Sequence, residues 1–206
     1  MGVKTKAKAF LLNLLTGKEI QEDFRRWEEL YGKFDQNNYD EFYVADLPSE
    51  SAVYHGEIIK WARDLKPKAI LFAGENNETA TRLKEIIQAE KVFTAGLSGT
   101  DFQWNFEKDA PVLEEKFDLL ISQAILEHLL NPYKHVEDLS NLLQENGHLI
   151  LHTVLPGFQY HRHPIDSLRF FPDWFEEVGQ RMNMEVVKKR IVGKHIFYMY
   201  KKMKRS

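Results

Sequence analysis

The sequence contains no cysteine among its 206 residues. This excludes disulfide bonds, thiolate nucleophiles and metal sites built on thiolate ligands, and it fits a reducing compartment. An excess of either charge is also lacking, because 28 Lys and Arg residues are balanced by 31 Asp and Glu residues, for a net charge of −3. We therefore expect no general attraction to nucleic acid.

Long apolar runs are missing as well. No window approaches the roughly 18 consecutive apolar residues that cross a membrane, so we predict no transmembrane segment. The short apolar run at residues 10–15 is interrupted by Asn13, which does not fit a signal peptide. We expect a soluble cytoplasmic protein, and a basic amphipathic helix on a membrane surface is the alternative for this segment.

Aromatic residues, in contrast, are abundant at 13% of the chain, with 14 Phe, 8 Tyr and 4 Trp. A chain of this length builds one domain with a core, or one domain with a small lid, and its many rings must be buried or line a pocket. Residues 1–66 have the pattern of helices and loops, and we predict an N-terminal helical cap or lid there.

From residue 67 onward, short apolar runs alternate with helical patterns. Because these runs are apolar on both faces, we predict a mostly parallel α/β sheet covered by helices on both sides. The predicted strands are 68–73, 91–97, 117–122, 148–155 and a C-terminal antiparallel hairpin of 185–192 and 195–200. The predicted helices are 49–65, 78–90, 124–130, 133–143 and 172–182. The segment 98–116 is too short for a full helix, and 100–106 is itself a strand candidate.

Ligands of such sheets bind beyond the carboxyl ends of the strands. The turn after the first strand holds Gly74, where the backbone can approach a ligand closely, and Asn76 or Asn77 can cap the next helix. Glu75 and Glu78 would repel a pyrophosphate at that helix end, which disfavours NAD and nucleoside triphosphates. A ligand that carries a cationic group would tolerate both carboxylates.

The loop after the strand at 148–155 is the richest in chemical groups. It contains His161, Arg162, His163, Asp166 and Arg169, which could supply a general base with an anchor for an anion or a sugar. Alternatively, Asp166 and Arg169 pair with each other and pin the loop. A metal held by His161, His163 and Asp166 is a further alternative, but His-x-His in a loop is a weak pattern, and we assign no metal ligand.

Polar groups also follow the strand at 117–122. Gln123 stands where that strand ends, and His128 lies in the helix expected next. His128 is either a proton acceptor at the rim of a site or a partly buried helical histidine with a satisfied hydrogen bond.

Taken together, residues 117–156 and 161–175 resemble the class I S-adenosylmethionine-dependent methyltransferases. The first stretch is similar to the family's fourth strand, its "LEH" helix, a second helix, a glycine turn and the fifth strand. The second, HRHPIDSLRFFPDWF, resembles a subgroup with an HPxDxxRF loop, which includes methyltransferases of polysaccharide and small-molecule biosynthesis. The resemblance implies a Rossmann-like, mixed seven-stranded sheet in residues 67–206.

The resemblance also implies S-adenosylmethionine as cofactor and assigns roles to residues. Expected cofactor-binding residues are Gly74, Glu75, Asn76, Leu97, Asp101 and Gln123. Expected catalytic residues are His163 or His128, one of which takes the proton, and Asp166, which orients that histidine. Expected substrate-binding residues are His161, Arg169, Tyr160 and Tyr43. The first family motif is degenerate here, because Phe72 stands where the family has an acid, and Asn76 and Glu78 replace two glycines.

Three functional hypotheses follow. The first is an O- or N-methyltransferase acting on a small-molecule or sugar-type acceptor. The second, motivated by the degenerate motif, is a catalytically inactive methyltransferase-like protein that binds or regulates a partner. The third is a metal-dependent enzyme on the same fold, with the metal at His161, His163 and Asp166. We leave a homodimer open.

Overall fold

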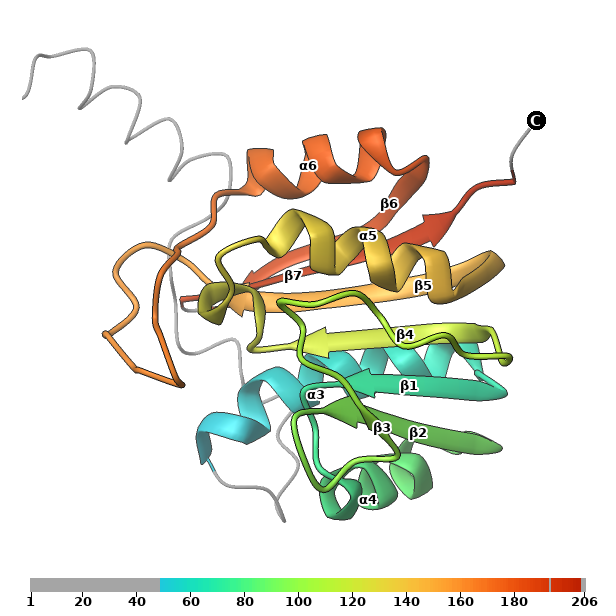
Figure 1. Cartoon of the computed structure of the whole chain (residues 1–206). Coiled ribbons are helices and arrows are strands. Elements are labelled where there is room, and N and C mark those ends of the chain that lie inside the picture. The colour runs from blue at the N-terminus through green and yellow to red at the C-terminus, as the bar shows by residue number, and fades with distance from the viewer. Residues whose placement is uncertain (1–48, 193, 205–206) are drawn as a thin grey trace, which may run out of the picture. The chain divides into compact units, whose positions relative to one another are not determined.

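The computed structural model describes residues 49–192 and 194–204, with side chains from residue 56 onward (Figure 1). Tyr43 and most of the predicted cap lie outside the described residues, so the domain boundary at residue 66 stays a prediction. Among the residues described, no helix is long and apolar enough to cross a membrane.

The described chain forms a seven-stranded sheet with the order β3-β2-β1-β4-β5-β7-β6. Its strands are β1 Ala69–Ala73, β2 Lys91–Gly96, β3 Phe102–Gln103, β4 Phe117–Gln123, β5 Leu143–Val154, β6 Met184–Val192 and β7 His195–Lys202. Strands β1 to β5 pair in parallel, whereas β7 runs antiparallel to both β5 and β6. The predicted mixed sheet and C-terminal hairpin are therefore confirmed.

Helices cover both faces of the sheet (Figure 1). They are α3 Ser49–Leu65, α4 Asn77–Ile87, the single-turn 3-10 helix η3 Leu126–His128, α5 Pro132–Leu142 and α6 Pro172–Arg181. Helices α3 and α4 pack in one apolar cluster with Ile70, Leu119 and Ile150 of the sheet. On the α6 side, Phe175 stacks on Tyr198 of β7, with ring centroids 4.6 Å apart.

As expected for residues 98–116, no helix lies between β2 and β4 in the described structure, and the strand candidate at 100–106 forms only the two-residue strand β3. One predicted helix, 124–130, is wrong, because only Leu126–His128 form a single 3-10 turn. Ala124 has a left-handed backbone (φ 51°), which excludes it from a helix, and Leu129 is extended. The carbonyl of Glu127 accepts hydrogen bonds from the backbone amides of distant residues 167 and 168 instead of continuing a helix.

Strand β5 begins earlier than the predicted 148, at Leu143. Asn146 has a left-handed backbone (φ 62°), and the register with β4 shifts between Phe117 and Leu119. The Asn146-Gly147 turn signal therefore marks an irregularity at the start of a long strand, because its positive φ bends the strand without ending it.

Edge strand β6 is tied to both helical layers by ion pairs. Lys188 and Arg190 pair with Asp64 and Glu57 of α3, at 3.0 and 3.3 Å. Lys189, between them, pairs instead with Glu176 of α6 at 2.9 Å. Successive side chains of a strand point to opposite faces, which explains this alternation.

Phe72, which stands where the methyltransferase motif has an acid, belongs to the core. Its side chain is fully buried in the cluster formed with α3 and α4. A carboxylate in this apolar position would lack a charged partner and would be costly to bury. The phenyl ring therefore contributes to the packing of helices against the sheet.

We predict that Phe72→Ala lowers the free energy of unfolding by about 3–5 kcal/mol, because it removes a buried ring and leaves a cavity. Phe171→Ala is the matched control, since Phe171 is 44% exposed. Chemical denaturation measures both. Similar losses for the two variants would contradict the core position of Phe72.

A second prediction concerns His135 of α5. Its Nε2 lies 3.0 Å from the hydroxyl oxygen of Ser122, and its ring packs against Trp104 and Phe106. Burial, with a smaller contribution from the charge of Lys134, lowers the pKa of His135 to about 3. The folded protein thus keeps this imidazole neutral, while the unfolded chain takes up a proton below about pH 6.5.

The wild-type protein should therefore lose stability as the pH falls below 6.5. His135→Gln, which cannot titrate, should lose roughly 1–2 kcal/mol less between pH 7 and pH 5. Urea denaturation of both proteins at several pH values measures the difference. Parallel pH profiles for the two proteins would show that His135 is not held neutral by the fold.

Candidate functional site

The turn between β1 and α4 forms the first part of the candidate site. Gly74 has φ 95°, and a Cβ there would lie 2.5 Å from Cδ1 of Ile125, so the turn requires glycine. The side chain of Asn76 caps α4 by accepting a hydrogen bond from the amide of Thr79 (2.9 Å), as predicted for Asn76 or Asn77. The side-chain amide of Gln123 at the end of β4 donates to the carboxylate of Glu75. The structure thus brings Gly74, Glu75 and Gln123 together.

The second part follows β2. The carboxylate of Asp101 accepts hydrogen bonds from the amide (2.8 Å) and the hydroxyl (3.1 Å) of Thr94. The Thr94 hydroxyl also contacts the side chain of Asn77 in α4. Leu97 extends from the end of β2 and is 61% exposed. Asp101 therefore holds the loop after β2 in shape, and Leu97 offers an apolar surface beside it.

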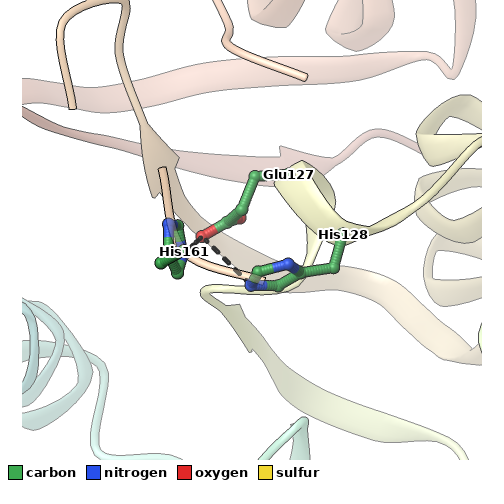
Figure 2. A group of neighbouring side chains, drawn as sticks. All are labelled: Glu127, His128 and His161. Atoms are coloured by element: carbon green, nitrogen blue, oxygen red, sulfur yellow. Dashed lines mark ion pairs between the residues drawn. The ribbon is translucent and has the colours of Figure 1, made fainter. Parts of the chain in front are cut away.

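The third part is a cluster of one carboxylate and two imidazoles, shown in Figure 2. Glu127 and His128 come from η3, and His161 comes from the loop after β5. The Oε1 atom of Glu127 lies 3.7 Å from Nε2 of His161 and 4.0 Å from Nε2 of His128. Glu127 is fully buried, and its other oxygen, Oε2, accepts a hydrogen bond from the hydroxyl of Thr153 (2.6 Å).

The loop that carries His161 is held by Asp166 and Arg169. Arg169 binds both carboxylate oxygens of Asp166, and its Nη2 lies 2.7 Å from Oδ2. Asp166 also accepts a hydrogen bond from the backbone amide of His161 (2.7 Å). The bond from Arg169 keeps the pKa of the Asp166 carboxyl well below its ordinary value, with a smaller contribution from the His161 amide. The alternative in which Asp166 and Arg169 pair and pin the loop is confirmed.

This arrangement differs from the sequence-based expectation in two ways. Asp166 lies beside His161, with 3.5 Å between its Oδ2 and Nδ1 of the ring, so it does not orient His163. His163 is exposed, and its ring centroid is 6.4 Å from that of His128. Tyr160 is 72% exposed, and Tyr43 lies outside the described residues.

The metal ligand set considered from the sequence also differs from the structure. Among the residues described, the group that could hold a metal consists of Glu127, His128 and His161, without His163 or Asp166. The reason is that both carboxylate oxygens of Asp166 already bind Arg169. Sequence reasoning missed Glu127 as a site residue, although an acid directly before His128 and just beyond a buried strand was the available signal.

We predict that Arg169→Gln lowers the free energy of unfolding by about 3 kcal/mol, because it leaves the buried Asp166 carboxylate without its cationic partner. The double variant with Asp166→Asn should recover part of this loss. Arg181→Gln, which breaks an exposed pair with Glu177, is the control and should cost far less stability, because solvent screens that pair. Denaturant titration measures all three, and equal losses for Arg169→Gln and Arg181→Gln would contradict a structural role of the buried pair.

Comparisons with known proteins agree with the fold. Residues 56–151 match a family model described as a methyltransferase domain. No curated protein matches the chain. Many solved structures share the fold, and three of them are described in the next paragraph.

A chain in the complex of the Haloferax volcanii Trm112 methyltransferase activator with a methyltransferase is 13% identical, with a TM-score of 0.58, over 74% of this chain and 91% of that one. A SAM-dependent methyltransferase from Aquifex aeolicus is 14% identical, with a TM-score of 0.58, over 82% and 99% of the two chains. Magnesium protoporphyrin IX methyltransferase from Synechocystis, with bound SAM, is 12% identical, with a TM-score of 0.56, over 95% and 96%.

The structural likenesses, at these identities, concern the fold, and the family model adds a match in sequence over β1, β2, β4 and most of β5. The observed seven-stranded mixed sheet, with its antiparallel C-terminal hairpin, is the one that the resemblance implies. The described chain therefore has the fold of the class I S-adenosylmethionine-dependent methyltransferases, and residues 56–151 match the sequence model of a methyltransferase domain.

Proposed function

We propose that the chain transfers the methyl group of S-adenosylmethionine to an oxygen or nitrogen atom of a small molecule. The observation that carries this proposal is the arrangement after β4. Gln123 ends the strand and contacts the Gly74 turn through Glu75, and Glu127 and His128 follow within one short segment. A cofactor site and a cluster of proton-accepting groups therefore share one edge of the sheet.

The residues at this edge fit the cofactor. S-adenosylmethionine supplies a methyl group bound to a cationic sulfonium. The turn at 74–78 contains two carboxylates, those of Glu75 and Glu78, and no basic side chain, which suits a cationic ligand. Phe72 is part of the apolar core cluster and not of the surface of the turn. We propose that Gly74, Glu75, Asn76, Leu97, Asp101 and Gln123 hold the cofactor.

The acceptor would lie on the side of His128. The Nδ1 atom of His128 lies 2.6 Å from the backbone oxygen of Ile165 and must donate its hydrogen to that oxygen. This fixes the tautomer and leaves a lone pair on Nε2. His128 can then accept the proton of the acceptor's O–H or N–H group at Nε2, while the acceptor atom gains the methyl group.

His161 and Arg169 are proposed to face the acceptor from the loop after β5, with exposed Tyr160 and His163 at its rim. The similarity of residues 161–175 to the HPxDxxRF subgroup supports a small-molecule or sugar-type acceptor. Asp166 is better assigned a positioning role, because it holds Arg169 and the backbone of His161.

The absence of an acidic residue at the tip of β2 favours the second hypothesis, a non-catalytic methyltransferase-like protein. The carboxylate that binds the ribose in the family would fall at Gly96 or Ser98, and neither residue is acidic. A cytoplasmic location and a homodimer also stay predictions from the sequence.

Calorimetric titration of the full chain with S-adenosylmethionine and S-adenosylhomocysteine tests the proposal. We expect binding, and we expect Glu75→Gln to weaken it about 10-fold, because this variant removes a carboxylate beside the cationic ligand. Glu85→Gln, at an exposed position farther along α4, is the matched control and should bind as the wild type does. No binding at millimolar cofactor would overturn the methyltransferase and support the non-catalytic protein.

A further inference from the structure

The cluster of Glu127, His128 and His161 has the composition of a metal site. One oxygen and two nitrogens, one atom from each residue, all lie within 4.8 Å of one another. Figure 2 shows the two imidazole rings on either side of the Glu127 carboxylate, which is directed between them. The two distances from Oε1 to the ring nitrogens, 3.7 and 4.0 Å, leave room for an ion between the three atoms.

Hydrogen bonds to the outer atoms orient all three side chains. His128 uses Nδ1 for the backbone oxygen of Ile165, at 2.6 Å. His161 places Nδ1 3.3 Å from the backbone oxygen of Gln159 and 3.5 Å from Oδ2 of Asp166. In both rings, a hydrogen on Nδ1 leaves a lone pair on Nε2, and it is Nε2 that faces Glu127. Histidines that bind metals are oriented in this way by oxygen acceptors on the other ring nitrogen.

The surroundings of Glu127 independently indicate a site for a cation. Glu127 is fully buried, and Thr153 donates a hydrogen bond to only one of its oxygens, Oε2. The other oxygen, Oε1, is buried without a hydrogen-bond partner and is directed toward the two imidazoles. Burial of a carboxylate oxygen is costly unless a cation or a donor reaches it. A cation between the three residues would remove this cost.

We propose that Glu127, His128 and His161 bind one divalent transition-metal ion, of the Zn²⁺ class. Two imidazoles and one carboxylate form a known ligand set for such ions, whereas Mg²⁺ and Ca²⁺ prefer oxygen ligands throughout. Three protein ligands leave at least one coordination position for an oxygen atom of water or of a bound molecule. His163 and Asp166 take no part in this set.

Metal binding at this cluster does not depend on methyl transfer. The role of the open coordination position does depend on methyl transfer, and this part of the inference rests on the proposed function. A hydroxyl group of the acceptor that binds the ion becomes more acidic, and its proton can leave to water. His128 is then a ligand and no longer the proton acceptor, and the acceptor class narrows to molecules with a hydroxyl group that can reach the metal.

Titration of the chelator-treated full chain with Zn²⁺, and with Co²⁺ as a spectroscopic probe, tests the site. We expect one ion per chain and visible absorption bands of bound Co²⁺. Glu127→Gln keeps the shape of the side chain but removes its charge and should weaken binding on the order of 100-fold. His148→Gln, at the opposite end of β5, is the control for adventitious binding to histidine and should leave binding unchanged.

His161→Gln is a second ligand variant, since its side chain is 33% exposed and the fold should tolerate the change better than at buried Glu127. Thermal melting confirms that each variant is folded. Absence of Zn²⁺ and Co²⁺ binding at roughly 100 μM ion, or equal affinity of His161→Gln and wild type, would overturn the site and leave an imidazole–carboxylate cluster without a metal. Because cofactor titration is a separate measurement, failure of either proposal is distinguishable from failure of the other.

Discussion

The position of Glu127 is the constraint on which the candidate site depends. Its backbone oxygen accepts hydrogen bonds from the amides of Ser167 (2.9 Å) and Leu168 (3.3 Å), and its carboxylate binds Thr153 of β5. The hydroxyl of Ser167 adds bonds to the backbone oxygens of Glu127 and Leu129. One short turn after β4 thus anchors the long loop after β5. Because the side chains of Glu127 and Thr153 are buried and would be costly to bury unpaired, this set of hydrogen bonds holds the loop in place.

The anchored loop then brings together groups that are distant in sequence. Asp166 and Arg169 close the loop on itself, and the amide of His161 binds the same carboxylate. His161 consequently reaches His128, with ring centroids 4.8 Å apart. The site is therefore built on hydrogen bonds between two loops, while the buried strands only set where those loops begin.

Most of the fold could be predicted from the sequence, because the apolar strand runs and the helical patterns are strong local signals. The segment 124–130 could not, since its helical composition is overruled by the left-handed backbone of Ala124 and by the distant bonds to Glu127. His128 and His161 could be singled out by type and position. Burial of Glu127 and the outward position of His163 could not be predicted, because both depend on how the two loops meet in space.

The alternating ion pairs of β6 have a consequence for strand pairing. Lys188 and Arg190 meet carboxylates of α3, whereas Lys189 meets one of α6. A slip of β6 by one residue would turn every side chain to the opposite face and separate each cation from its carboxylate. The same row of basic side chains lies at the edge of the sheet that the described residues form, where like charges oppose pairing with the β6 of a second molecule. The basic run at residues 188–190 therefore stabilises one register of the hairpin and opposes aggregation through this edge of the sheet.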